Sequence, residues 1–559
     1  MSGDGDFMST LSAILANTYN ADRDQRKSAE ENLSKYWTLP NAFSGFLQLA
    51  AQNNGDIHVR MASALALKNK VRRFWSLQPE GKAPGDAPQQ DYPPMTEEEK
   101  NYVKSTILET LMVETNNTLR KMFAEILRSI SDYEFPDRWP ALLPTLVSNI
   151  EGPDRLRVYN SLVALRKLIK RYEYKSGEKR AILYFIVQTT FPPIQTLLNN
   201  IREMDIIEAG SVMHMSIKIF WSATMYQLPP PEFTFDWNFW FQFLAFTLEK
   251  RLPEASEGLE PGGQPTAEDA REKWPWWKMK KWSSRCISHI MQRYGNPKHV
   301  ASNNVEFAKT FRTHTSVSLL GPVMNTLASK SSGAFVTSAV RRYCLTYMAS
   351  AVEMSPTYKL IKPHLHFVLF QVIFPTLFMP AEDEALMNSD PVEYVRRIHS
   401  ASLDWLDHRH AASNLIERMA KLRESDVVPL VLKFVQSKLD EYQAATGTRK
   451  EQMHREKDAV LQIIGHIANT LVKSPAGSSE MEPFISNHVV PDFQSGCAFV
   501  RSRCCWVLEW FTKLDWNRFS PTTLQSILEG LMGRLSDPSL AVQNSAACAL
   551  RTIIGTCYI

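Results

Sequence analysis

The sequence is poor in cysteine, and its cysteines form no recognisable pattern. Seven occur in 559 residues, and an odd number is a poor basis for a disulfide framework. None are spaced as a CxxC pair, and most lie inside apolar helical patterns, as buried thiols do in a reducing compartment. They are Cys286, Cys344, Cys497, Cys504, Cys505, Cys548 and Cys557. The cysteines therefore indicate a protein of the cytosol or nucleus.

Long apolar runs and charge of one sign are also missing. No uninterrupted apolar run reaches the roughly 18 residues that a membrane-spanning helix needs. Residues 1–6 are acidic and lack the basic start of a signal peptide. The net charge of +4 is close to balance, whereas a nucleic-acid footprint over the whole protein needs a strong basic excess. We therefore expect no membrane span and no direct binding of nucleic acid.

Catalytic motifs are absent as well. The sequence has no GxxxxGK[ST] loop, no GxGxxG after a strand and no HExxH helix. The nearest histidine pairs are His364 with His366 and His408 with His410. Their i, i+2 spacing places the two members on different sides of a helix, a poor arrangement for metal ligands. We expect no enzyme activity, no metal and no cofactor.

Helical periodicity is what the sequence does contain. Apolar residues recur at i, i+3, i+4 and i+7 in nearly every patterned segment, and no series of alternating strands is evident. Similar helices begin near Val59, Leu119, Leu156, Met213, Trp277, Val340, Val395, Asp458, Val500 and Ala541. The last three starts lie roughly 40 residues apart, the period of HEAT repeats. The pattern predicts an all-α chain that forms a right-handed superhelical solenoid of HEAT repeats.

Three insertions interrupt the repeats. Residues 78–95, 252–271 and 474–483 are rich in Pro, Gly and polar side chains, so they cannot bury enough apolar surface to offset the entropy of ordering. We expect them to be flexible loops. The chain ends directly after an apolar helix rather than after a polar capping repeat, which indicates the first half of a longer solenoid.

The segment 274–297 contains four tryptophans and three lysines close together. Two interpretations compete. Trp276, Trp277 and Trp282 can stack on nucleic-acid bases while the lysines hold phosphates. Alternatively, the rings pack inside one repeat while the lysine stems extend towards solvent. The repeat pattern on both sides favours packing.

Two ordered motifs carry a resemblance to a known family. The first, between residues 29 and 75, reads AE..L and then VR.A.A..LKN.V...W. The second is the turn Phe135-Pro136-Asp137-Arg138-Trp139-Pro140. Both are similar to segments of importin-β (karyopherin-β) nuclear transport receptors. The segments 275–295 and 390–396 resemble the importin seven/eight branch, although Met279, Ser283 and Ser284 replace the Cys and Ala of that branch.

The resemblance implies where partners bind. It predicts an importin-β N-terminal domain over residues 1–110, followed by further HEAT repeats over 111–559. In the family, the first repeats hold the small GTPase Ran in its GTP form, which places a Ran surface at Arg60, Lys68, Asn69, Arg72, Arg166 and Lys170. An ordinary solvated helix face is the alternative for these basic runs. Glu382, Asp383, Glu384 and Asp390 form a predicted acidic loop that meets Ran or a basic cargo, or is simply solvated.

The function implied by the resemblance is nuclear import. Such a receptor binds basic cargo such as ribosomal proteins or histones, contacts Phe-Gly nucleoporins, and releases cargo when Ran-GTP binds. Importin-β itself is a candidate co-receptor, and the protein is expected to shuttle between cytoplasm and nucleus. An exportin of the same superfamily and a HEAT scaffold, such as a phosphatase regulatory subunit, remain alternatives.

Overall fold

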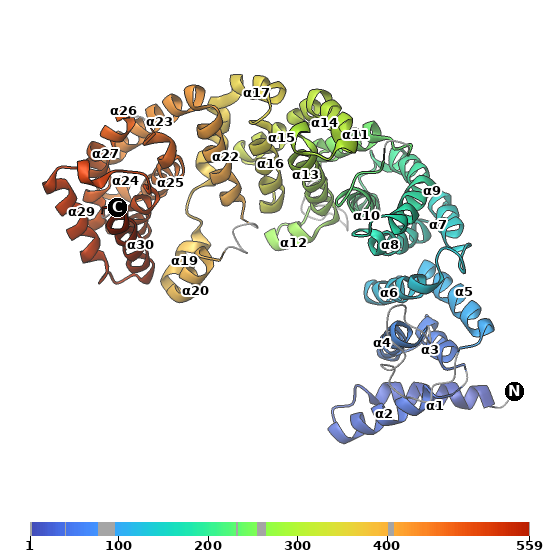
Figure 1. Cartoon of the computed structure of the whole chain (residues 1–559). Helices are drawn as coiled ribbons and strands as arrows, with labels where there is room; N and C mark the ends of the chain where they lie inside the picture. Colours follow the sequence, from blue (N-terminus) through green and yellow to red (C-terminus); the bar gives the residue numbers. More distant parts are fainter. Residues whose placement is uncertain are drawn as a thin grey trace. The chain divides into compact units, whose positions relative to one another are not determined.

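The computed structural model describes residues 3–39, 41–75, 95–230, 233–253, 264–400, 407–473 and 475–557. All regular secondary structure in these ranges is helical, and no strand occurs in them (Figure 1). The helices group into two compact units, each considered by itself. Unit 1 comprises 1–239 and 252–279, and unit 2 comprises 240–251 and 280–559.

Helices α1 to α10 and α12 lie in unit 1, while α11 and α13 contribute residues to both units. Their bounds are α1 (Gly3–Asn17), α2 (Arg23–Tyr36), α3 (Ala42–Ala51), α4 (Ile57–Phe74), α5 (Glu97–Val113), α6 (Asn117–Glu134), α7 (Leu142–Glu151), α8 (Arg155–Tyr172), α9 (Glu178–Ile201), α10 (Ile207–Thr224), α11 (Trp237–Glu249), α12 (Glu268–Lys273) and α13 (Pro275–Tyr294).

Unit 2 continues with α-helices and short 3-10 or π segments. The α-helices are α14 (Val305–Thr310), α15 (Ser316–Ser331), α16 (Ser338–Ala351), α17 (Ser355–Ile361), α18 (Phe374–Thr376), α19 (Ala381–Ser389), α20 (Pro391–Ile398), α22 (His408–Leu422), α23 (Glu424–Ala444), α24 (Gly447–Gln452), α25 (His454–Leu471), α26 (Pro475–Ser479), α27 (Met481–His488), α28 (Ala498–Trp510), α29 (Pro521–Arg534) and α30 (Leu540–Cys557). The shorter segments are η1 (Pro297–His299), η2 (Ser302–Asn304), η3 (Phe311–Thr315), η4 (Lys362–His364), η5 (Phe367–Ile373), η6 (Val490–Gln494) and η7 (Trp516–Arg518).

In unit 1 the helices pair, and each pair contacts the next. The second helices α4, α6, α8 and α10 follow one another as neighbours, and we call them ladder helices. The first helices form a parallel row in which α3 contacts α5 and α7 contacts α9. Asp56, Asn116 and Asp154 cap α4, α6 and α8 by accepting hydrogen bonds from first-turn backbone N–H groups. The same side-chain cap thus begins three successive ladder helices, which explains the regular repeat in the sequence.

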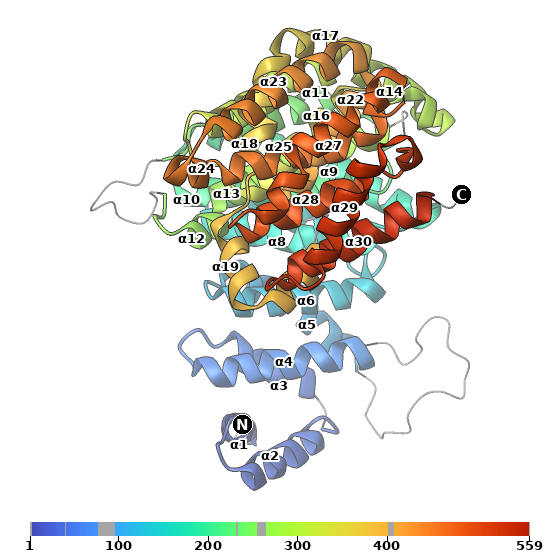
Figure 2. The same ribbon diagram turned by 90° about the vertical axis from the view of Figure 1, so that its left-hand side faces the viewer.

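Unit 2 has its own ladder of α16, α22, α25, α28 and α30, and the last three lie side by side (Figure 2). The prediction that a repeat helix of the ladder begins near Val395 is wrong. That segment is α20, which contacts α19 and α30, and α22 occupies the position between α16 and α25. The apolar side chains of α22 that fill this position include Ala412, Leu415 and Met419. The other predicted helix starts each fall within a few residues of a ladder helix or of α13.

The predicted loops have three different outcomes. Residues 76–94 lie outside the described part, so the loop at 78–95 stays a prediction. The segment 252–271 is described only outside 254–263, and α12 begins within it. The prediction of a loop at 474–483 is wrong, because α26 and the start of α27 lie in this range after residue 474. Burial of Met481 and Ile485 in α27 explains this difference.

The tryptophan segment is a packed helix. Trp276 and Trp277 are 0% and 6% exposed, which leaves their rings no face for stacking on a base. Trp282 is half-buried, and the guanidinium of Arg285 lies 4.7 Å from its ring centroid. In unit 1, the Trp276 ring lies directly against Gly210 of α10. In unit 2, the buried ammonium of Lys280 donates to the carbonyl of Leu248 at 2.5 Å, and burial lowers its pKa to about 8. The packing of the rings is therefore confirmed, but the expectation that the lysines extend towards solvent is wrong for Lys280.

Buried ion pairs join successive helix pairs. In unit 1, Arg60 of α4 contacts the carboxylate of Glu114 at the end of α5, at 2.6 Å. Glu134 of α6 accepts from the indole of Trp75 at 2.9 Å and from Lys104 at 3.2 Å. Unit 2 repeats the device with the pairs Lys457–Asp492, Arg501–Asp537 and Arg503–Asp458. Since a buried charge without its partner is costly, these pairs fix how each repeat sits on its neighbour.

Two apolar segments have the length and composition of a membrane span. They are α9 and the bent pair Ser355–His364 with Phe367–Ser389. In α9 the side chains of Leu183, Ile186 and Ile194 are fully buried, and Arg180 in its first turn donates to the carbonyl oxygens of Glu173 and Ala223. We interpret α9 as a core helix of unit 1.

Gly210→Ala tests the packing of Trp276. A Cβ atom at residue 210 would lie 2.9 Å from the indole ring, so either the ring or the helix has to move. Overpacking of this kind costs about 1–3 kcal/mol. We expect a lower midpoint of urea denaturation. Gly533→Ala in α29 is the control, because its Cβ meets nothing within 4 Å, and it should leave the midpoint unchanged or raise it. Equal midpoints for the two variants would contradict the packing.

Arg60→Ala tests the first buried ion pair. The substitution leaves the carboxylate of Glu114 buried without its partner, which costs about 3–5 kcal/mol. Hydrogen exchange should show this loss locally, as reduced protection of the amides of α3 and α4. Arg72→Ala, on an exposed position of the same helix, should change protection by no more than about 0.5 kcal/mol. Similar protection in both variants would show that the buried pair does not stabilise this repeat.

Candidate partner-binding surfaces

An exposed stripe runs along the second half of α4. Leu65, Asn69 and Arg72 are exposed and spaced by four and three residues, so they share one face of the helix. Lys68 is half-buried and lies one turn before Arg72. The structure thus places Lys68, Asn69 and Arg72 together on an accessible surface, which we call the α4 stripe.

Arg60 does not belong to this surface. Its side chain is only 6% exposed, and its guanidinium donates to Glu114, to the carbonyl of Ala50 and to Asn53. The guanidinium is therefore occupied inside the repeat, and its predicted role as a partner-binding residue is a misassignment. Sequence could not show this, because Glu114 lies 54 residues away.

Arg166 and Lys170 belong to a second basic region of unit 1. They are one turn apart on α8; Lys170 is exposed and Arg166 half-buried. Burial lowers the pKa of Arg166, and its Nε and Nη1 atoms have no hydrogen-bond partner in the described residues. On α10, burial and the nearby charges of Arg166, Lys170, Lys278 and Lys167 lower the pKa of Lys218 to about 8. So many like charges create a positive potential that attracts an anionic partner.

A basic cavity of about 610 Å³ opens beside this region. It lies between α6, α8 and the start of α9, and no motif in the sequence indicates it. Its lining consists of Glu125, Arg128, Asp132, Lys167, Lys170, Arg171, Tyr172, Lys175 and Lys179. Of the residues predicted from sequence, only Lys170 takes part.

The predicted acidic loop is wrong. Glu382, Asp383 and Glu384 form the first turn of α19, and Asp390 caps α20 by accepting from the backbone N–H of Glu393 at 3.0 Å. Asp383 pairs with Arg409 at 2.5 Å, and Glu384 pairs with Arg455 at 2.8 Å.

These pairs tie the α19–α20 segment to α22 and α25 within unit 2. Asn544 of α30 and His399, which follows α20, also lie within hydrogen-bond distance at 2.7 Å. Glu382 and Asp390 are exposed and have no ion pair in the described residues, so two of the four predicted acidic charges are neutralised internally. The arginine partners follow far along the chain, which is why the sequence suggested a free loop.

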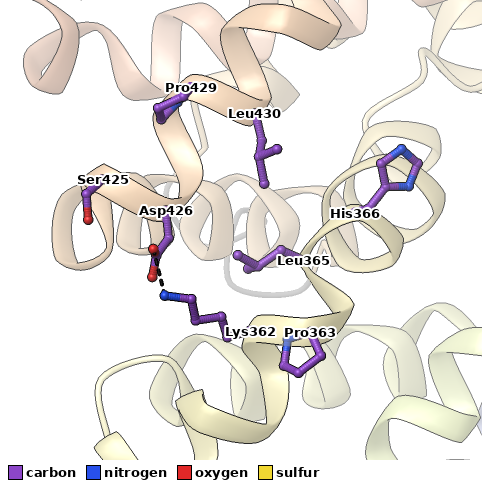
Figure 3. Close-up of a pocket in the computed structure, with 8 residues that line it drawn as sticks. All are labelled: Lys362, Pro363, Leu365, His366, Ser425, Asp426, Pro429 and Leu430. Atoms are coloured by element: carbon purple, nitrogen blue, oxygen red, sulfur yellow. Dashed lines mark hydrogen bonds and ion pairs between the residues drawn. The ribbon is translucent and has the colours of Figure 1, made fainter.

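A groove of about 470 Å³ lies between the segment that directly follows α17 and helix α23 of unit 2 (Figure 3). One wall carries Lys362, Pro363, Leu365 and His366, and the other carries Ser425, Asp426, Pro429 and Leu430 of α23. An ion pair of 2.9 Å between Lys362 and Asp426 closes one end. Hydrogen bonds from Lys362 and from Tyr358, at 2.7 Å, hold the pKa of Asp426 below its usual range. The prolines and leucines leave an apolar floor, and we call this the α17–α23 groove.

The described residues contain no group of three or more His, Cys, Asp or Glu side chains arranged to hold a metal ion. His408, from one of the two histidine pairs, is largely buried, and burial together with Arg341 lowers its pKa to about 4. The α4 stripe, the basic cavity and the α17–α23 groove are lined by charged, polar and apolar side chains.

Two family models match the chain. The "Importin-beta N-terminal domain" matches residues 29–113, and "Cse1" matches residues 342–550. The "Importin beta-like SAD2 homolog" of Arabidopsis thaliana is 27% identical over 99% of this chain and 52% of its own length. Human "Importin-8" is 27% identical over 95% of this chain and 49% of its length. The chain spans about half the length of the curated relatives it matches.

Solved structures share the fold. Cse1, an exportin in its cargo-free, cytoplasmic state, superposes with a TM-score of 0.67 at 18% identity, over 98% of this chain and 56% of its own. Importin beta gives a TM-score of 0.64 at 16% identity, over 98% and 56%. These likenesses confirm the prediction of an all-α HEAT-repeat solenoid. The family models and relatives agree with this fold: an importin-beta N-terminal domain matches residues 29–113, and the chain is similar over 95–99% of its length to proteins named as importins.

Proposed function

We propose that this chain acts in nuclear import, as a receptor that binds basic protein cargo and releases it when Ran-GTP binds. The observation that carries the proposal is the importin-beta N-terminal domain at residues 29–113, which contains the exposed α4 stripe. Relatives that match nearly the whole chain are named as importins, which supports import rather than export. Import requires no chemistry on the cargo, so the receptor works without a catalytic site or cofactor, shuttling between cytoplasm and nucleus.

The proposed Ran surface consists of Lys68, Asn69 and Arg72 on α4, extended by Arg166 and Lys170 on α8. The α4 side chains are accessible, and the α8 side chains contribute positive potential. Kap121p, which shares the fold at a TM-score of 0.54, has been solved bound to RanGTP. Arg60 supports this surface from inside, since its pair with Glu114 positions α4.

Nucleoporin binding is proposed at the α17–α23 groove. A phenylalanine side chain fits between the apolar faces of Leu365, Pro363, Pro429 and Leu430. The ammonium of Lys362 and the carboxylate of Asp426 can form hydrogen bonds with the backbone of the peptide beside the inserted ring. Kap121p bound to Nup53p shows that a protein of this fold takes a nucleoporin.

Release of cargo follows from the way repeats contact only their neighbours. A partner that favours one arrangement of successive repeats changes the free energy of binding elsewhere along the ladder. The coupling is reciprocal, so cargo must weaken Ran-GTP binding by the same factor as Ran-GTP weakens cargo binding. Importin-β as a co-receptor would act on the same equilibrium.

Export is the second candidate, favoured by the Cse1 family match at residues 342–550 and by a 23% identical relative named Exportin-2. A pull-down on immobilised chain, with a histone or ribosomal protein as cargo, separates the two directions. We expect excess Ran-GTP to reduce bound cargo at least about tenfold, within the usual range of allosteric coupling. An increase in bound cargo would show export, and no response would contradict both.

Charge reversal tests the Ran surface itself. Lys68→Glu with Arg72→Glu should weaken Ran-GTP binding by about tenfold or more, because two attractive contacts become repulsive. Titration calorimetry gives the affinity, and the circular dichroism spectrum confirms the fold. Lys298→Glu with Lys309→Glu is the control, as both lysines are exposed in unit 2. Equal affinities for the two double variants would remove the α4 stripe from the Ran surface.

Leu430→Asp tests the groove. Leu430 is 38% exposed at the groove wall, and a carboxylate there disfavours an inserted phenylalanine ring. We expect retention on a Phe-Gly repeat column to fall several-fold. Leu422→Asp, at a position that is 45% exposed but outside the groove, should leave retention unchanged. Undiminished retention of the Leu430 variant would place nucleoporin binding elsewhere.

A further inference from the structure

The basic cavity of unit 1 carries more positive charge than its own structure uses. Six cationic side chains and two carboxylates line it. Glu125 accepts from Arg128 at 2.7 Å and from Lys167 at 2.6 Å. Asp132 accepts from Arg128 at 3.1 Å and forms an ion pair with Arg171 at 2.9 Å. Both carboxylates are thus fully engaged with three of the six cations.

The three remaining cations are Lys170, Lys175 and Lys179. All are exposed, and none has an ion-pair partner in the ranges that the structure describes. They come from the last turn of α8, the connection to α9 and the first turn of α9. Three lysines on three segments around one cavity is an arrangement with no internal purpose, since nothing in the described fold neutralises it.

The inner wall of the cavity adds a directional donor. The hydroxyl of Tyr172, whose side chain is 2% exposed, accepts a hydrogen bond from Arg171 at 2.7 Å. Its own proton is therefore left to donate to a ligand. Helix α9 also begins at the cavity after Gly177, which has a φ of 58° and makes no side-chain cap, so the positive end of this helix dipole reinforces the potential.

We propose that the basic cavity binds an acidic segment, rich in Asp and Glu, of a protein partner. A single phosphate group is best held by the bidentate fork of a free arginine. Here both guanidinium groups are committed: Arg128 to Glu125 and Asp132, and Arg171 to Asp132 and to the carbonyl oxygens of Ser131 and Asp132. Separated lysines act as independent point charges, and they match several carboxylates spaced along an extended peptide.

This inference shares one residue, Lys170, with the proposed Ran surface. Lys175 and Lys179 do not belong to the proposed Ran surface, so a variant of these two lysines tests the cavity alone. Failure of Ran-GTP to bind would leave peptide binding intact, and loss of peptide binding would leave the Ran result unchanged.

The test uses a fluorescein-labelled decapeptide of alternating Glu and Asp, titrated with the full chain at 150 mM salt and followed by fluorescence anisotropy. We expect saturable binding that weakens as salt rises, because the contacts are between exposed charges. Lys175→Glu with Lys179→Glu should weaken it by about tenfold or more, since two attractions become repulsions. Lys359→Glu with Lys421→Glu is the matched control; these lysines are exposed and lie outside the cavity.

Tyr172→Phe provides a second variant that keeps every charge. It should weaken the peptide by about two- to tenfold, because one hydrogen bond to a carboxylate is lost. Three results would overturn the proposal: no saturable binding, an equal loss in the control variant, or retained affinity in the Lys175 and Lys179 variant. Tighter binding of a phosphoserine peptide or of a single-stranded RNA of the same length would overturn the choice of an acidic protein segment.

Discussion

Burial between successive ladder helices is the constraint on which the rest of this structure depends. A helix pair such as α3 with α4 has too little core of its own, so it gains its stability from the next pair. Charged side chains are buried in these junctions, and pairs such as Arg60–Glu114 and Arg501–Asp537 leave little freedom in how one repeat sits on the next. The same junctions decide which side chains remain for partners, because a residue used between repeats is not available outside them.

Much of the fold could be predicted from sequence because it is a local property. Helical periodicity is read within a few residues, and it predicted most of the repeat starts. The caps Asp56 and Asp154, which begin α4 and α8, are equally local. The prediction failed where an insertion imitated the repeat: α20 has the expected pattern, yet α22 occupies the ladder position. Distinguishing the two needs the long-range contacts of α16 and α25. The packing of the tryptophan segment could be predicted, because regular repeat helices precede and follow it in the sequence.

The candidate surfaces were predictable only in part. The exposed half of α4 follows from helix periodicity, and Lys68, Asn69 and Arg72 lie there as expected. The assignment of Arg60 failed because its partner, Glu114, belongs to the next helix pair, and the acidic residues at 382–384 failed because their arginine partners lie 26 and 71 residues further on. The basic cavity and the α17–α23 groove have no signature in sequence, since each is formed by side chains from neighbouring pairs.

The proposed import role requires that the first repeats bind Ran in its GTP form, so comparing the two nucleotide states of Ran is the sharpest test of it. The chain is titrated by calorimetry with Ran loaded with a non-hydrolysable GTP analogue and, in parallel, with Ran-GDP. We expect saturable binding of the GTP form that is at least about a hundredfold tighter than binding of the GDP form, a difference of about 2.7 kcal/mol. Equal affinities for the two forms, or no binding of either at micromolar concentration, would contradict it.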